Sequence, residues 1–182
     1  MAKVWGKKAQ NRELIIKAAR EVMMEKGASK ITYQDVADKA DMSRTTVFNH
    51  FPSMQSLMES VMESDFEESY RYYCNLKSAG TERILDLFLH HMENLESNLL
   101  LTMTELSTIV SSERGRTLYQ ALDQKMKNDL GKELTDQERN DIMTDLTGVY
   151  AGVIFRAYLY EETDPKIIRE DFLRLAREIL GV

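Results

Sequence analysis

Three side chains with strong hydrogen-bonding groups, Arg44, Thr45 and Asn49, lie within one short segment of the chain. Arginine presents a planar fork of N–H donors, threonine a hydroxyl, and asparagine a donor and an acceptor next to each other. Such groups can recognise the hydrogen-bonding edges of another molecule. The segment therefore offers polar recognition and does not by itself offer bond cleavage.

Enzyme and metal chemistry find little support in the sequence. There is no phosphate-cradling glycine loop, no nucleophile elbow, no His-Glu metal helix and no evident base beside a nucleophile. Asp86 and His90 are four residues apart and provide half of a metal site at most, because His91 faces another direction on a helix. The single cysteine, Cys74, cannot form an internal disulfide. We therefore expect no enzyme activity, no cofactor and no bound metal ion.

Two short helices are predicted around the polar segment. Thr32 and Asp35 have the spacing of a capping box, in which the hydroxyl accepts a free amide of the first turn, so a helix is predicted to begin near residue 33. Asp41 tolerates a left-handed backbone conformation, and Ser43 is a strong N-cap. These residues predict a turn followed by a second short helix over residues 44–50.

Longer helices are predicted on both sides of this pair. Apolar residues at helical spacing predict a helix over residues 11–26, and Gly27 lies where a left-handed C-cap belongs. Pro52 ends the second short helix. Ser53 can then cap a long amphipathic helix that reaches about residue 74.

Two short helices joined by a turn and preceded by a packing helix form a helix-turn-helix unit, which places its second helix in the major groove of DNA. Ala37 is small where the helices cross, Val47 can fill the shared core, and Phe51 can close its end. The outer face of the second helix then holds polar residues: Arg44, Thr45, Thr46 and Asn49. The pattern predicts a DNA-binding domain.

The rest of the chain is also predicted to be helical, because only eight Gly and two Pro interrupt the whole sequence. Further helices are expected from residue 81, over 99–110, over 113–130, over 135–161 and from residue 165 onward. The expected fold class is all-α with about nine helices. We expect a DNA-binding domain over residues 1–52 and a helical domain over residues 53–182.

A specific pattern of residues runs through the predicted helix-turn-helix. It begins with Ile15-Ile16-Lys17-Ala18-Ala19, Gly27, Thr32 and Asp35-Val36-Ala37. It continues through Met42-Ser43-Arg44-Thr45-Thr46-Val47-Phe48-Asn49-His50-Phe51-Pro52-Ser53 and then Leu57. In this register residues 11–60 resemble the DNA-binding domain of the tetracycline-repressor (TetR) family. The remaining chain resembles the family only in helix number, helix length and a long penultimate helix.

The resemblance implies a role for each polar residue. It implies that Arg44, Thr45 and Asn49 face base edges, arginine being the usual reader of guanine and asparagine of adenine. It also implies that Gln34 reaches a base. Contacts with phosphates set the register without reading sequence, and the residues implied near them are Thr32, Tyr33, Thr46 and His50. The implied DNA-facing set further includes Ser43 and Phe48.

Three positions depart from the family pattern. Asp41 replaces the usual turn glycine, at a moderate cost because aspartate tolerates a positive φ better than most residues. Phe48 replaces a tyrosine, and Met54 replaces a lysine, both of which commonly contact phosphate in the family. Two phosphate contacts are therefore expected to be missing.

The charge of the chain is distributed asymmetrically. Residues 1–50 hold ten Lys or Arg against six Asp or Glu, a net +4, and the remainder holds 14 against 24, a net −10. A basic first quarter can neutralise phosphates while the acidic remainder limits unproductive contact with DNA. We hypothesise that the missing phosphate contacts are replaced by a basic arm of Lys3, Lys7, Lys8 and Arg12. The alternative is a solvated tail.

The helical domain is predicted to form a homodimer. Gly148, Ala151 and Gly152 place small residues on one side of the helix over 135–161, which allows a partner helix to approach closely. The last helix carries a broad apolar stripe. We expect a two-fold dimer in which the last two helices form a four-helix bundle. The alternative is that these residues pack within one chain.

A small-molecule cavity is predicted in the same domain. Met fills irregular space and Tyr adds a polar group, and the residues predicted to line the cavity are Met92, Met103, Tyr119, Phe155 and Tyr158. The alternative is that they form plain core.

These expectations combine into one function. By resemblance, the chain is expected to be a repressor that a small-molecule effector releases from a palindromic operator in double-stranded DNA. The rival is a helical dimer that binds DNA or a protein without sensing a ligand. No segment approaches about 18 uninterrupted apolar residues, and the N-terminus lacks the apolar stretch of a secretory signal. We therefore expect a cytoplasmic protein with no membrane partner.

Overall fold

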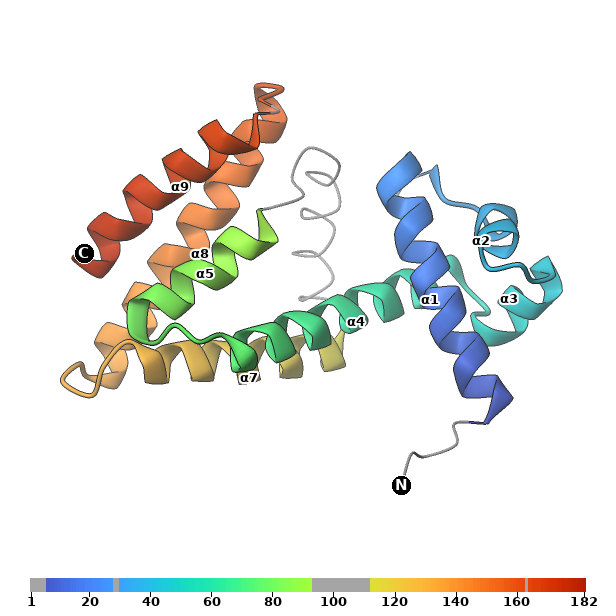
Figure 1. The fold of residues 1–182 in the computed structure, drawn as a ribbon, viewed down its shortest axis with the longest axis horizontal. Helices are drawn as coiled ribbons and strands as arrows, with labels where there is room; N and C mark the ends of the chain where they lie inside the picture. Colours follow the sequence, from blue (N-terminus) through green and yellow to red (C-terminus); the bar gives the residue numbers. More distant parts are fainter. Residues whose placement is uncertain (1–5, 28–29, 93–111, 163) are drawn as a thin grey trace. The chain divides into compact units, whose positions relative to one another are not determined.

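The computed structural model describes residues 6–27, 30–92, 112–162 and 164–182. These residues form eight helices and no strand (Figure 1). The helices are α1 Lys7–Lys26, α2 Tyr33–Lys39, α3 Arg44–His50, α4 Met54–Asn75, α5 Gly80–His91, α7 Glu113–Asp129, α8 Asp136–Leu159 and α9 Pro165–Leu180. The predicted all-helical fold class is confirmed. The helix predicted over residues 99–110 lies outside the described residues.

The first helix is longer than predicted. α1 begins at Lys7, whereas the sequence pattern placed its start at residue 11. Lys, Ala and Gln, which fill the added turn, are all good helix formers, so the helix continues back to Gly6. Lys7, Lys8 and Arg12 of the hypothesised basic arm are therefore part of a helix, and Lys3 lies outside the described residues.

Local hydrogen bonds determine where α2 and α3 begin. Thr32 Oγ1 accepts the Asp35 N–H at 3.2 Å, and the Asp35 carboxylate accepts the Thr32 N–H at 3.1 Å, which confirms the predicted capping box. Asp41 has a φ of 52°, in the left-handed region that the turn was expected to need. Ser43 Oγ accepts the Thr46 N–H at 3.0 Å and caps α3.

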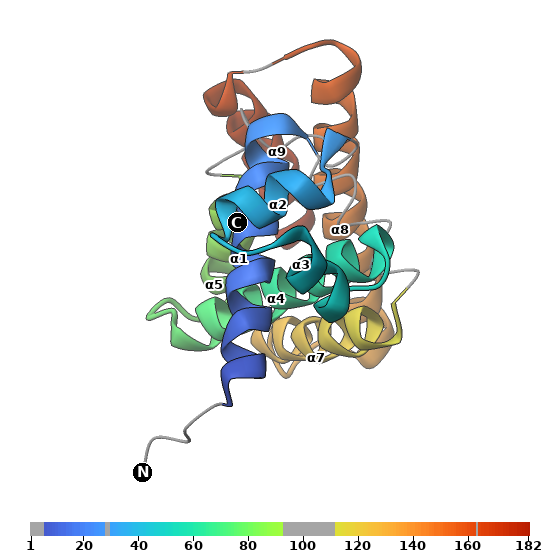
Figure 2. The ribbon, with the colours of Figure 1, turned by 90° about the vertical axis from the view of Figure 1, so that its right-hand side faces the viewer.

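Two compact units make up the chain, Met1–Asp65 and Phe66–Val182. In the first unit, α2 packs against both α1 and α3 (Figure 2). Its core consists of buried apolar residues, including Ile15, Ala19, Val22, Val36, Ala37, Val47, Phe51, Leu57 and Val61. α4 contributes residues to both units, and the boundary predicted between residues 52 and 53 lies just before this helix.

The second unit is held together by an aromatic cluster. α8 and α9 form an antiparallel pair (Figure 1), α5 packs against α7 and α9, and α7 packs against α8. The ring of Phe88 lies 5.2 Å from that of Tyr150 and 5.2 Å from that of Phe172, between ring centroids. Such aromatic pairs stabilise a core beyond the area that they bury. The cluster therefore joins α5, α8 and α9.

The last two helices begin where their sequences predict. Thr135 and Glu138 form a second reciprocal capping box at the start of α8. Asp164 Oδ1 accepts the Lys166 N–H at 2.9 Å, and Pro165 occupies the first helical position of α9. At 24 residues, α8 is the longest of the described helices. None of the helices described is long and apolar enough to cross a membrane.

A polar cluster joins the end of α4 to α5 and α7. The Tyr73 hydroxyl donates to Asp129 Oδ2 at 2.6 Å, and an Arg83 N–H donates to the same oxygen at 3.3 Å. Arg83 also donates from Nε to the carbonyl of Ser78 at 2.6 Å. Burial, and then the hydrogen bond to Asp129, raise the pKa of Tyr73, so its hydroxyl remains a donor at neutral pH.

Candidate nucleic-acid interface

One face of α3 is polar and exposed to solvent. Arg44, Thr45 and Asn49 are exposed on it, whereas Val47 is completely buried on the opposite side. In the parts of the chain that the structure describes, these three side chains make no hydrogen bond or ion pair. Their donors and acceptors are therefore available to an external partner.

Other residues of the predicted DNA-facing set also stabilise the domain. Thr32 and Ser43 cap α2 and α3, as described above. The Thr46 hydroxyl shares a hydrogen bond of 2.8 Å with Ser43 Oγ. Gln34 Nε2, on the exposed surface of α2, donates to Asp38 Oδ1 at 2.7 Å. His50 is half-buried in the last turn of α3. These polar side chains have hydrogen-bond partners within the chain or are partly buried, unlike the three exposed polar side chains of α3.

Tyr33 and Phe48 form an aromatic pair between α2 and α3. Their ring centroids are 5.7 Å apart, in an edge-to-face arrangement with an interplanar angle of 62°. The Tyr33 hydroxyl donates to the carbonyl oxygen of Phe51 at 2.8 Å, and burial raises the pKa of this phenol. Phe48 remains 51% exposed. The pair thus joins the two helices while one ring still faces solvent.

Sequence reasoning missed the contacts that fix α1 against α4. Arg12 Nη2 donates to Ser60 Oγ at 2.8 Å, and its guanidinium lies 4.3 Å from the centroid of the Phe51 ring. Arg20 forms an ion pair with Asp65. The two hydrogen-bonded pairs are 48 and 45 positions apart in the chain, so no local spacing indicates them. Arg12 therefore contributes to the packing of the domain and is not part of a free arm.

The predicted ligand-binding residues that the structure describes lie in the second unit and differ in their exposure to solvent. Met92 is completely buried in the core of the second unit, and the Tyr119 hydroxyl lies 3.4 Å from Thr147 Oγ1. Phe155 and Tyr158 are each 48% exposed on α8. Met103 lies outside the described residues. The other four residues do not line the pocket between α8 and α9.

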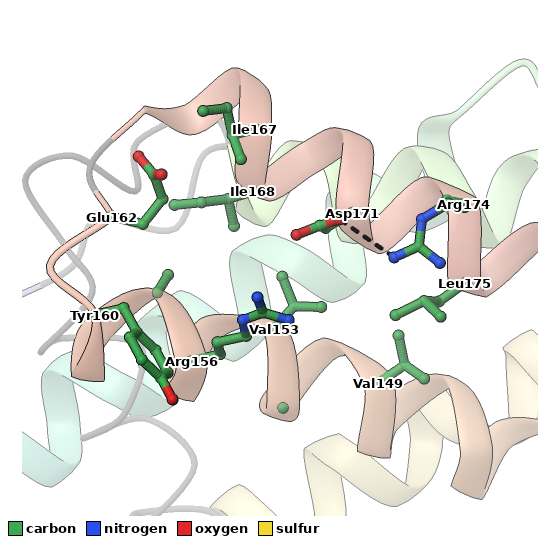
Figure 3. Close-up of a pocket in the computed structure, with 12 residues that line it drawn as sticks. Val149, Val153, Arg156, Tyr160, Glu162, Ile167, Ile168, Asp171, Arg174 and Leu175 are labelled. Atoms are coloured by element: carbon green, nitrogen blue, oxygen red, sulfur yellow. Dashed lines mark hydrogen bonds and ion pairs between the residues drawn. The ribbon is translucent and has the colours of Figure 1, made fainter.

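A pocket of about 410 Å³ lies between α8 and α9 (Figure 3). Its walls combine apolar side chains, among them Val149, Val153 and Ile167, with charged ones. Asp171 and Arg174 form an ion pair of 3.3 Å at one side of it. The pocket is therefore an open, mixed groove along the outer side of the helix pair.

Two histidines lie together at the end of α5. His91 Nε2 is 2.8 Å from Ser69 Oγ, and the ring of His90 stacks on that of Tyr72 at 3.8 Å between centroids. Burial, and then the neighbouring His90, lower the pKa of His91 to about 4. His91 is thus neutral at pH 7. Among the residues described, no three His, Cys, Asp or Glu side chains are grouped to hold a metal ion.

The geometry defines a class of protein: a helix-turn-helix domain with a polar, exposed second helix, followed by a helical unit. Residues 15–61 match the model of the bacterial regulatory proteins of the tetR family. The DNA-binding domain of the chain is therefore of the tetR type, as the resemblance predicted.

Comparison with known proteins gives one partial sequence match and several matches in fold. The chain is 29% identical over 97 residues to the HTH-type transcriptional regulator LuxR of Vibrio harveyi, a match that covers 53% of this chain and 43% of LuxR. A TetR transcriptional regulator from Rhodococcus sp. RHA1 has the same fold, with a TM-score of 0.66, 18% identity and coverage of 97% and 98% of the two chains. FadR of Thermus thermophilus, a TetR family repressor in complex with lauroyl-CoA, gives a TM-score of 0.61, 20% identity and 93% coverage of both chains.

Proposed function

We propose that the protein is a transcription regulator that binds a palindromic DNA operator as a homodimer and releases it when a small molecule binds. The observation that carries this proposal is the exposed face of α3. Arg44, Thr45 and Asn49 extend from a helix whose start is fixed by the Ser43 cap and whose inner side is buried through Val47. Rigidly held arginine and asparagine side chains can each form paired hydrogen bonds with a base in the major groove.

Selection of bound duplexes from a random DNA pool tests the first half of the proposal. We expect an enriched palindrome with half-sites about one helical turn, or 34–36 Å, apart. Binding is then measured at two salt concentrations, because lysine and arginine contacts with phosphates make affinity fall with salt. Recovery of no enriched sequence would contradict the proposed function.

The exposed side of α8 supports a dimer. Gly148 and Gly152 lie one turn apart there, and a Cβ atom added to either would meet no described atom within 4 Å beyond its chain neighbours and the backbone of its own helix. Phe155 and Leu159 continue this side and are 48% and 58% exposed. Small residues let a second helix approach closely, and a partner would bury the two large side chains. A second copy of the chain, related by a two-fold axis, suits this surface.

Ligand response is the remaining part of the proposal. The FadR relative holds lauroyl-CoA, and α4 is one continuous helix with residues in both units of this chain. A ligand that shifts α4 would change the separation of the two α3 helices in a dimer. A coupling of about 1–3 kcal/mol would weaken DNA binding roughly 5- to 150-fold. Our proposed ligand contacts remain Met92, Met103, Tyr119, Phe155 and Tyr158.

A screen of small molecules tests the ligand response. Compounds that raise the melting temperature of the protein are added to the complex with the selected operator, and release is measured by fluorescence anisotropy. We expect at least one stabilising compound to weaken operator binding. If every compound that binds leaves operator affinity unchanged, the rival function of a non-sensing DNA-binding dimer is favoured.

A further inference from the structure

Phe48 is a large apolar side chain on the otherwise polar outer face of α3. Arg44 and Thr45 lie four and three residues before it, and side chains at these spacings are neighbours on a helix surface. Phe48 is 51% exposed. Its ring therefore belongs to the same surface as the two residues proposed to contact base edges.

The ring of Phe48 is also held in place. It meets the Tyr33 ring edge-to-face at 5.7 Å, and Tyr33 is itself fixed by the hydrogen bond of 2.8 Å from its hydroxyl to the carbonyl of Phe51. This carbonyl belongs to the residue that directly follows α3. The inner part of the Phe48 ring thus rests on a rigid support, and the outer part stays open to a partner.

The chemistry of a phenyl ring restricts what it can contact on DNA. It has no donor for a phosphate oxygen, and placing it against a phosphate would remove water from the anion without replacing the lost hydrogen bonds. The edges of the base pairs in the major groove carry one methyl group, the 5-methyl of thymine, and phenylalanine is among the side chains that contact it.

We propose that Phe48 determines specificity for a thymine by packing against its 5-methyl group in each operator half-site. The proposal rests on the proposed DNA-binding function. A thymine is favoured over the apolar part of a deoxyribose because the neighbours of Phe48 on the helix surface, Arg44 and Thr45, are themselves proposed to reach base edges.

Replacement of thymine by deoxyuridine tests this contact, because it removes only the methyl group. Each thymine of the selected operator is replaced in turn in both half-sites, and the dissociation constant is measured for the wild type and for Phe48→Ala. For the wild type we expect one position at which the change weakens binding about fourfold per half-site, the effect of losing one buried methyl group. For Phe48→Ala we expect no weakening at that position.

Two further variants keep the result interpretable. Phe48→Gln keeps a side chain of similar reach without the apolar ring and is expected to lose the same sensitivity, while Leu14→Ala, at a site 52% exposed on α1, is expected to retain it. Thermal unfolding shows that each variant is folded. The slope of affinity against salt should not change in Phe48→Ala, because the ring displaces no counterion.

The outcomes separate this inference from the function on which it rests. If the protein selects an operator but the wild type is insensitive to deoxyuridine at every position, or if Phe48→Ala keeps the full sensitivity, the thymine contact is overturned while DNA binding stands. The first of these results would assign the ring to the deoxyribose. A protein that selects no DNA sequence overturns both.

Discussion

Ser43 and Arg44 are neighbours in the chain with different tasks. The Ser43 hydroxyl accepts the Thr46 N–H and caps α3, so its loss would act through folding. The Arg44 side chain is exposed and makes no ion pair with the described residues. Its loss is therefore expected to act on binding alone, which makes it the cleaner probe of DNA recognition.

Arg44→Ala is expected to weaken operator binding by about 1–3 kcal/mol and to relax the preference at one base pair. The reason is the loss of a paired hydrogen bond to guanine, while the buried side of α3 is unchanged. Affinities for operators carrying each alternative base pair measure the effect. The matched control is Arg177→Ala, at an exposed site near the end of α9. It should leave the affinities for all of these operators unchanged. A uniform loss across sequences would instead assign Arg44 to phosphate contact.

Stability is expected to fall as the pH is lowered from about 6.5 to about 4. Burial lowers the pKa of His91 from 6.5 to about 4 in the folded state, so only the unfolded chain gains a proton in this range. The contribution of His91 to the free energy of unfolding, up to about 3 kcal/mol, is fully present above pH 6.5 and is lost as the pH falls to about 4. Urea unfolding of the wild type and His91→Gln at several pH values measures it.

The His91→Gln variant should show a weaker pH dependence than the wild type over this range, because glutamine keeps a hydrogen-bonding group near Ser69 without titrating. The same substitution at His50, in the other unit, is the matched control. Equal slopes for the wild type and His91→Gln would contradict the assignment.

At the scale of helices, the polar cluster of Tyr73, Arg83 and Asp129 joins three elements that no local pattern connects. Tyr73 is 1% exposed near the end of α4, and its hydroxyl donates to Asp129 of α7. Because α4 has residues in both units, this cluster fixes the part of α4 that belongs to the second unit.

Tyr73→Phe is expected to lower the free energy of unfolding by about 1.5–3 kcal/mol, the range for a hydrogen bond to a charged group. The raised pKa of Tyr73 also means that the folded state keeps its proton when the unfolded phenol, with a pKa of 10.0, loses it. Wild-type stability should therefore fall as the pH rises above about 10. Tyr73→Phe should lack this part of the pH dependence, and Tyr160→Phe, at a site 77% exposed, is the control.

The first turn of α1 carries two of the cations that were hypothesised to contact phosphate. Lys7 and Lys8 are exposed there, and the double variant Lys7→Ala/Lys8→Ala is expected to weaken binding to all sequences and to reduce the salt slope by about 1 for each lost contact. The double variant Lys132→Ala/Lys166→Ala, exposed in the second unit, controls for net charge. Equal salt slopes for the two double variants would favour a solvated first turn.

At the scale of the whole molecule, recognition of a palindrome requires two copies of α3. A two-fold dimer supplies them, since the same surface then serves both partners. We place this contact on the exposed side of α8, which is formed by Gly148, Gly152, Phe155 and Leu159. The groove between α8 and α9 lies along the same helix pair (Figure 3).

Phe155→Asp is expected to weaken the dimer by at least about 2 kcal/mol, because it removes a central apolar contact and buries a charge. Sedimentation equilibrium measures the dissociation constant, and operator affinity should fall with the loss of dimer. Val182→Asp makes the same type of change at a residue 66% exposed beyond the end of α9 and should leave the dimer intact. A fully dimeric Phe155→Asp would place the interface elsewhere.

Local chemistry was sufficient to predict most helix boundaries. Each of these predictions depends on residues at most three positions apart, and the structure contains all of them. They are the capping pairs Thr32 with Asp35 and Thr135 with Glu138, the Ser43 cap and the left-handed Asp41. The exposed face of α3 follows from the same short-range periodicity. Residues close together in the chain are therefore sufficient to predict the helix-turn-helix and its match to the tetR DNA-binding domain.

Interactions between distant parts of the chain are visible only in the folded structure. Arg12 was assigned to an arm because its charge is visible in the sequence, whereas its contacts with Phe51 and Ser60 arise only when α1 and α4 pack together. Phenylalanine is a residue type typical of cores and cavities, and only the folded chain shows that Phe155 is half exposed. Residue type specifies which interactions a side chain can make, but the packing of distant helices selects which of them form.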